Sequence, residues 1–86
     1  MRRYTVTWWQ SADDDLLRLW LDSPERSRIT DASREIDKKL SSSADSIGEE
    51  VREGLRALEV DPLRVQYAVE KEDRIVRVWT VRLTDQ

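Results

Sequence analysis

The chain contains no cysteine, no histidine and no phenylalanine. The first two absences exclude disulfides, thiol nucleophiles, imidazole bases and nearly all transition-metal sites. No uninterrupted apolar run approaches the ~18 residues that span a bilayer, and no apolar segment follows the basic start Met1-Arg2-Arg3. We therefore expect a cytoplasmic protein with no membrane contact, no metal ion and no small-molecule cofactor. Its chemistry must come from Arg, Lys, Glu, Asp, Tyr or Ser.

The sequence has 86 residues, of which 38% are hydrophobic and 38% are charged. That length provides one hydrophobic core, so we expect a single domain over residues 1–86. With 15 basic against 18 acidic residues, the net charge of −3 gives no overall attraction to nucleic acid. Twelve of the 15 basic residues are arginine, however, and arginine is the cation suited to bidentate contacts with phosphate or carboxylate.

The first half of the sequence predicts a strand followed by two helices. Residues 3–9 alternate β-branched and aromatic side chains, which is typical of a strand. A helix over residues 12–21 follows, with Ser11 as its cap and Asp13-Asp14-Asp15 in its first turn. Carboxylates are favoured there by the helix dipole, so we interpret the three aspartates as a helix start, not as a metal site. The expected buried stripe of this helix contains Ala12, Leu16, Leu17, Trp20 and Leu21.

A second helix is indicated by Ser23-Pro24-Glu25, because proline favours the first helical position. Its apolar residues recur at helical spacing up to Leu40, where we expect it to end. The two helices then form a hairpin. Residues 41–45 are polar and without periodicity, and they predict a connecting loop.

The second half of the sequence predicts three strands. Residues 51–60 suggest one strand with a bulge near Ala57, and Asp61-Pro62 suggests a turn. Residues 63–69 alternate cleanly, and residues 70–73 form a charged hairpin loop. Residues 74–83 carry apolar side chains of both parities, which favours a central strand covered on both faces.

Together these elements predict an α+β fold. It has an N-terminal strand, a helical hairpin across one face of the sheet, and a three-stranded antiparallel meander, with the first strand parallel to the last. We expect Trp8, Trp20, Trp79 and Tyr67 in the core, because each lies on an apolar face of its element. Trp9 has the opposite parity and is expected to be exposed, where it can stack a base or anchor a partner.

Three segments carry a resemblance to a known family: residues 54–58, residues 62–69 and residues 73–81. With the order of elements, they resemble the RelE/ParE superfamily, the toxins of type II toxin–antitoxin systems, also described as plasmid stabilisation proteins. The similarity extends over nearly the whole chain. It implies a βααβββ two-layer sandwich, a bacterial toxin and a cognate antitoxin as partner.

The RelE-like branch of this family binds messenger RNA in the ribosome and promotes its cleavage by the RNA's own 2′-hydroxyl. Guanidinium groups suit such a site, because they stabilise charge on the scissile phosphate without a histidine or cysteine. By position, the resemblance implies catalytic roles for Arg64, Arg56 and Arg82. It implies RNA binding by three further arginines on the same strands: Arg74, Arg77 and Arg52.

Two alternatives stay open at the level of sequence. The chain ends without the basic residue and the Tyr or His that RelE-like toxins commonly carry after the last strand, and it is acidic where they are basic. A ParE-like toxin, which inhibits DNA gyrase by protein contact, needs no nuclease residues. A plain interaction domain that binds a protein through Trp9 or a sheet edge is the third reading, with the arginines paired to neighbouring glutamates and aspartates.

Overall fold

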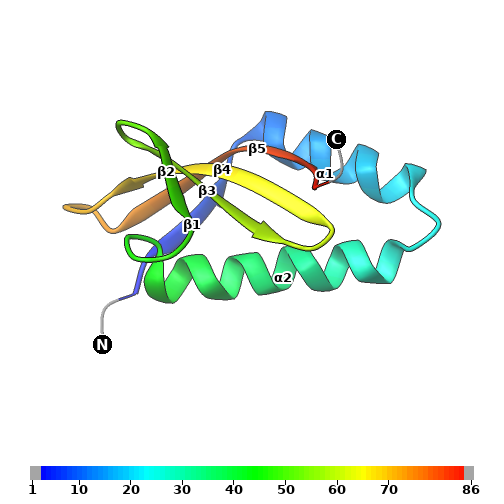
Figure 1. Ribbon diagram of the computed structural model, residues 1–86, viewed down its shortest axis with the longest axis horizontal. Helices are drawn as coiled ribbons and strands as arrows, with labels where there is room; N and C mark the ends of the chain where they lie inside the picture. Colours follow the sequence, from blue (N-terminus) through cyan, green and yellow to red (C-terminus); the bar gives the residue numbers. More distant parts are fainter. Residues whose placement is uncertain (1–2, 85–86) are drawn as a thin grey trace.

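The computed structural model describes residues 3–84 and contains two helices and five strands (Figure 1). In chain order the elements are β1 (Thr5–Trp8), α1 (Gln10–Asp22), α2 (Arg26–Ser43), β2 (Glu49–Arg52), β3 (Leu55–Val60), β4 (Leu63–Glu70) and β5 (Ile75–Leu83). No helix in this part of the chain is both long and apolar enough to cross a membrane.

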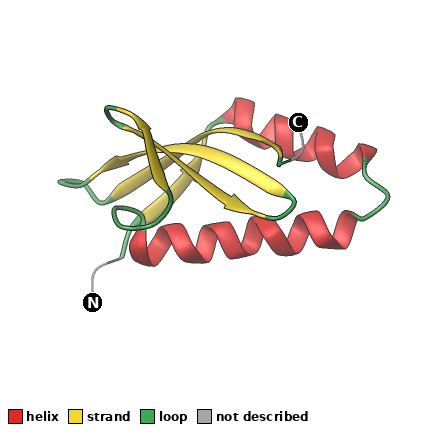
Figure 2. Ribbon diagram, in the orientation of Figure 1, coloured by secondary structure: helices red, strands yellow, loops and turns green. Residues whose placement is uncertain are grey.

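The strands form one sheet in the order β1-β5-β4-β3-β2. β1 runs parallel to β5, and the other neighbours are antiparallel. The α+β class, the helical hairpin and the parallel pairing of the first strand with the last are confirmed. Figure 2 shows α2 running along the sheet and α1 lying beside β5.

The single strand predicted over residues 51–60 is wrong, because this stretch belongs to two strands. β2 and β3 are joined by a tight turn at Glu53 and Gly54, where Gly54 has a φ of +82° that favours glycine. The predicted bulge at Ala57 is also absent from the regular β3–β4 ladder, and the irregularity lies in β2, between Glu50 and Arg52.

The core lies between the helices and one face of the sheet. α2 supplies Ile29, Ala32, Ile36 and Leu40, and the sheet supplies Leu63, Val65, Tyr67, Val76, Val78 and Val81. Tyr67 is fully buried, as predicted. Trp8 is half-buried against this core, and its Nε1 donates a hydrogen bond to Asp37 Oδ1 of α2 at 2.7 Å.

An extra residue in β5 decides which side chains reach the core. Tyr67 pairs with Val78, but Gln66 pairs with Thr80, so Trp79 has no opposite residue in β4. Such a bulge reverses the parity of the strand, and Val76 and Val78 before it share a face with Val81 after it. The mixed parity of residues 74–83 therefore reflects this bulge and not burial on both faces. Trp79 is consequently 39% exposed, so its predicted core position is wrong.

Both helices differ from their predicted bounds or faces. α1 begins at Gln10, with Trp9 instead of Ser11 at the capping position. Of its predicted apolar stripe, Leu17 and Leu21 are 55% and 53% exposed. α2 continues past Leu40 to Ser43, so the predicted loop begins three residues too early.

The extension of α2 has a local cause in its serines. The hydroxyls of Ser41 and Ser42 donate to the carbonyl of Lys38, at 2.9 and 3.2 Å. These bonds return to the preceding helical turn instead of competing with it, so a polar serine run is compatible with helix here.

Candidate functional site

The face of the sheet opposite the helices, here called the open face, is formed by alternate residues of the strands. Cross-strand pairing places Arg64 with Arg82, Gln66 with Thr80 and Ala68 with Arg77. The same ladder adds Glu59 opposite Arg64 and Ala57 opposite Gln66. Because Leu63, Val65 and Tyr67 point to the helices, the residues between them point to the open face.

Arg64 and Arg82 are the two predicted catalytic residues that the structure brings together. They occupy directly opposite positions in β4 and β5. The Arg64 guanidinium forms an ion pair with Glu59 Oε2 at 3.4 Å, and its side chain is 30% exposed. Within residues 3–84, Arg82 has no ion-pair partner. Arg64 and Arg82 therefore occupy neighbouring positions on this face, and Arg82 also lines a cavity with Asp15 and Asp22 of α1.

The three predicted RNA-binding arginines lie in different settings. Arg77 shares the open face with Arg64 but forms an ion pair with Glu70 of β4. Arg52 is at the end of β2, opposite Leu55. Arg74 lies in the turn before β5 with a φ of +55°, and its carbonyl accepts a hydrogen bond from the Thr5 amide at 2.8 Å. Arg74 therefore lies outside the paired strand positions that form the open face.

Arg56 lies on the helix side of the sheet, opposite Tyr67 in the β3–β4 ladder. Its Nε and Nη2 donate to the carbonyl of Ile47 at 3.1 and 3.0 Å, and Nη2 also reaches the Gly48 carbonyl at 3.4 Å. These bonds hold the loop between α2 and β2. The third predicted catalytic arginine is thus not gathered with Arg64 and Arg82, and its local contacts are structural.

Tyr67 contacts the same loop between α2 and β2. Its hydroxyl lies 2.9 Å from the Ile47 carbonyl and 3.2 Å from that of Ala44, so it donates to these acceptors. Burial raises the pKa of Tyr67, while the hydrogen bond and charge of Arg56 lower it and the charge of Asp45 raises it. The phenol is buried in the core between the sheet and the helices, where its hydrogen bonds stabilise the fold.

The open face also carries two stacked tryptophans, here called the indole pair. The rings of Trp9 and Trp79 lie 4.2 Å apart between centroids, with 22° between their planes. Trp9 is 41% exposed, as its parity predicted. Trp79 was missed as a surface residue, because the β5 bulge that exposes it depends on pairing with β4. The run of apolar residues of both parities was the one signal of that bulge.

A cavity of about 330 Å³ lies next to the indole pair. It is lined by Arg52, Leu55, Gln66, Trp79 and Thr80. Thr80 Oγ1 is a buried polar atom without a hydrogen-bond partner among the described residues. The cavity combines an apolar wall with a polar rim, the usual composition of a small ligand site.

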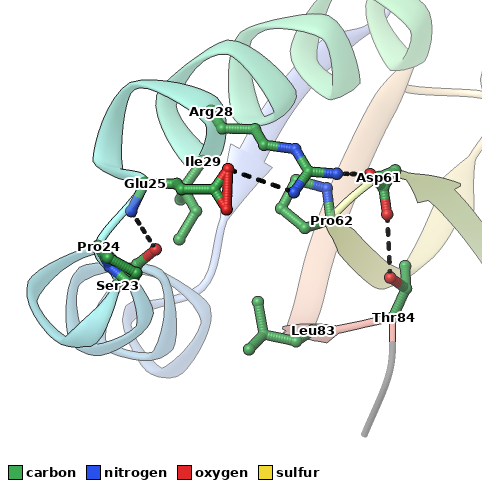
Figure 3. Close-up of a pocket in the computed structure, with 9 residues that line it drawn as sticks. All are labelled: Ser23, Pro24, Glu25, Arg28, Ile29, Asp61, Pro62, Leu83 and Thr84. Atoms are coloured by element: carbon green, nitrogen blue, oxygen red, sulfur yellow. Dashed lines mark hydrogen bonds and ion pairs between the residues drawn. The ribbon is translucent and has the colours of Figure 1, made fainter.

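A larger cavity of about 460 Å³ lies at the end of the molecule where the helical hairpin turns (Figure 3). Arg28 forms ion pairs there with Asp61 and with Glu25, the latter at 3.6 Å, and Thr84 Oγ1 donates to Asp61 Oδ1 at 3.4 Å. The one guanidinium is thus neutralised by two carboxylates. This cavity contains none of the predicted site residues.

Between α1 and α2 lies an apolar depression, here called the hairpin groove. Its cavity of about 290 Å³ is lined by Leu16, Leu17, Trp20 and Ile29, with Asp13, Thr30 and Ser33 at its border. Trp20 Nε1 donates to Thr30 Oγ1 at 3.1 Å and joins the two helices. The exposed Leu21 continues the apolar surface one helical turn beyond Leu17.

Comparison with known proteins gives a consistent picture of the fold. No protein-family model matches the chain, and no curated protein sequence matches it significantly. Solved structures do match. A chain of the RelBE2 toxin–antitoxin complex from Mycobacterium tuberculosis superposes with a TM-score of 0.81 at 21% identity, over 100% of this chain and 97% of that chain.

Two further structures represent both branches of the resemblance. A chain of the chromosomal ParDE system from P. aeruginosa has a TM-score of 0.72 at 14% identity, covering 94% of this chain and 96% of that one. The isolated RelE toxin from E. coli has a TM-score of 0.66 at 15% identity, covering 96% and 86%. The chain therefore has the fold of the RelE and ParE toxins, which confirms the predicted architecture.

Proposed function

We propose that this protein is the toxin of a type II toxin–antitoxin module and is held inactive by a cognate antitoxin. The observation that supports this most is the similarity of fold to the RelBE2 complex, which covers the whole chain. A fold alone supports many activities, so the residues on the open face must carry the rest of the argument.

The activity we propose is ribosome-dependent cleavage of messenger RNA in the cytoplasm. The RNA's 2′-hydroxyl loses its proton to water and bonds to the adjacent phosphorus, which forms a 2′,3′-cyclic phosphate. The bond to the 5′-oxygen of the next nucleotide breaks, and that oxygen takes a proton from water. Arg64 and Arg82 stabilise the negative charge that develops on the phosphate oxygens, since the two arginines occupy opposite positions of β4 and β5 on the open face. Arg77 and Arg52 share that face and contribute phosphate contacts, whereas the bonds of Arg56 to the Ile47 carbonyl favour a structural role.

A second candidate is inhibition of DNA gyrase by protein contact. The similarity of fold to the ParDE chain, with a TM-score of 0.72, supports it. The ion pairs of Arg64 and Arg77 also fit this reading, because they reduce the positive charge available for RNA. A non-catalytic interaction domain is the third outcome that the experiment below separates.

The antitoxin we propose docks an amphipathic helix in the hairpin groove. Leu17 and Leu21 are more than half exposed and lie one turn apart on α1, so a helix with matching apolar side chains would bury both. Continuation of the antitoxin over the open face, with carboxylates near Arg64 and Arg82, would cover the candidate active site.

The test of toxicity is expression of the chain in a bacterial host, with and without the product of the neighbouring gene. We expect growth arrest that the neighbour relieves. Arg64→Ala should restore growth, and Arg34→Ala, on the exposed surface of α2, is the matched control that should not. Harmless expression of the folded wild-type protein would refute the toxin proposal.

The target is identified by two assays on the purified protein. Cleavage of messenger RNA on ribosomes, lost in Arg64→Ala, supports the ribonuclease. Inhibition of supercoiling by gyrase without cleavage supports the ParE-like alternative. For the antitoxin, co-purification with the neighbouring gene product should be lost in Leu17→Asp and kept in Arg34→Ala.

A further inference from the structure

The indole pair is an unusual feature for the surface of so small a chain. Trp9 follows β1 and Trp79 is the bulge residue of β5, yet their rings stack at 4.2 Å and remain about 40% exposed. Burial of aromatic surface is strongly favourable, so two large rings left on one uncovered face indicate a binding surface. The stacking fixes both rings, which lowers the entropy lost when a third planar group binds.

The cavity beside the indole pair supplies groups that could hold such a planar ligand. Leu55 and Trp79 provide apolar surface, while Gln66 carries an amide with both donors and acceptors. Thr80 also lines the cavity, but its hydroxyl oxygen Oγ1 is buried beneath the surface. Arg52 closes the rim with a positive charge. The volume of about 330 Å³ lies at the lower end of the ~300–1,000 Å³ typical of small-ligand sites.

We propose that this cavity binds one nucleobase of single-stranded RNA, stacked on Trp79 with Trp9 behind it. The amide of Gln66 hydrogen-bonds the edge of the base, and Arg52 contacts a phosphate. Base stacking on aromatic rings beside cationic side chains is how single strands are held in proteins. A polar rim fits a base better than it fits the apolar side chains of a peptide. The inference rests on the proposed ribonuclease function and names a site for its substrate.

The cavity lies close enough to Arg64 and Arg82 for a base bound in it to position a phosphate at the two arginines. The Gln66–Thr80 pair is two residues along β4 from the Arg64–Arg82 pair, about 7 Å away on the same face. That separation is comparable to the distance between the base and the phosphate of one nucleotide. A base held against Trp79 therefore positions a neighbouring phosphate at Arg64 and Arg82, and Trp79 is a positioning residue for cleavage.

The experiment measures the affinity of the full chain for an unstructured seven-nucleotide RNA by fluorescence anisotropy at low salt. Trp79→Ala should weaken binding about 5- to 150-fold, the effect of losing one base stack. Trp79→Phe, which keeps an aromatic ring, should restore most of the affinity. On the wild-type protein, an RNA series with one abasic position each should show one position at which affinity drops. This last arm does not depend on how any variant folds.

Two results would overturn the inference. One is equal affinity of wild type and folded Trp79→Ala for RNA together with no effect of any abasic position. The other is loss of antitoxin binding in Trp79→Ala while RNA affinity is unchanged, which would make the indole pair a protein contact. Either result can occur while Arg64→Ala still abolishes toxicity, in which case the inference fails and the proposed function stands. Conversely, RNA binding that depends on one base can persist in a protein that arrests no growth, in which case the proposed function fails and the inference stands. Failure of the inference and of the proposed function are thus distinguished.

Discussion

Arg64 of β4 and Arg82 of β5 stand directly opposite each other in an antiparallel ladder, on the uncovered face of the sheet. Like charges at opposite positions raise the free energy of the folded state. Glu59 compensates Arg64 at 3.4 Å, and within residues 3–84 no carboxylate pairs with Arg82. A phosphate bound by both arginines would relieve this repulsion. The arrangement that destabilises the free protein would then favour binding of the proposed RNA substrate.

The first prediction separates stability from activity at this pair. Arg82→Gln should raise the free energy of unfolding by up to about 1 kcal/mol, because it removes the repulsion, and it should reduce toxicity. Urea denaturation and a growth assay measure the two effects. Arg34→Gln is the control, expected to change neither. A clear loss of stability in Arg82→Gln would show that Arg82 makes contacts beyond those described.

The second prediction concerns Arg56. Arg56→Ala should lower the free energy of unfolding by about 1.5–3 kcal/mol, because two nitrogens of its guanidinium donate to the Ile47 carbonyl. Arg56→Lys should recover little, since lysine cannot reproduce the planar fork. Urea denaturation checks both. Normal stability combined with loss of RNA cleavage in Arg56→Ala would instead support the catalytic role that the family resemblance implies.

The third prediction follows from the buried phenol of Tyr67, whose pKa is raised by burial. Above pH ~10 the unfolded chain releases this proton while the folded protein retains it. The free energy of unfolding should therefore fall as the pH rises from about 10 to the folded pKa. In Tyr67→Phe this part of the pH dependence should disappear, and stability at pH 7 should drop by about 1 kcal/mol because the hydrogen bond to Ile47 is lost. An unchanged slope would contradict the assignment.

The fourth prediction compares two glycines with similar backbone angles. Gly48 has a φ of +73° and Gly54 a φ of +82°, so alanine costs about 1 kcal/mol at each. A Cβ at Gly48 would lie 2.3 Å from the carbonyl oxygen of Ala57, whereas a Cβ at Gly54 would meet open space. Gly48→Ala should therefore be clearly the more destabilising in thermal denaturation. Equal effects would mean that the loop moves away at no cost.

The fifth prediction tests the unpartnered hydroxyl of Thr80. Thr80→Val keeps the shape of the side chain and removes a buried polar atom that has no partner among the described residues. We expect the free energy of unfolding to rise by up to about 1 kcal/mol, while affinity for RNA stays unchanged because the buried Oγ1 is out of reach of a base. Thermal denaturation and anisotropy give the two values. Reduced stability would reveal a hydrogen bond of this hydroxyl in solution.

Much of the fold was predictable because its patterns are local. The alternation of residues 63–69 identified β4 and its buried face, and it placed Tyr67 in the core and Arg64 on the opposite face. The parity of Trp9 predicted its exposure correctly. The end of α2 was missed, since the serines at 41 and 42 satisfy their hydroxyls on the preceding helical turn.

The candidate site was predicted less completely, because it depends on register between strands distant in sequence. The sequence by itself determined the order of the elements, apart from the division of residues 49–60 into β2 and β3. It also determined the absence of histidine and cysteine chemistry and the supply of arginines. Only the tertiary structure decided which arginines meet. The unpaired Trp79 in β5 reverses the parity of the strand, so Val81 points into the core and Arg82 lies opposite Arg64. Trp79 itself stays on the open face, where its ring stacks on Trp9. A bulge arises from the pairing of two strands, so no single segment encodes it.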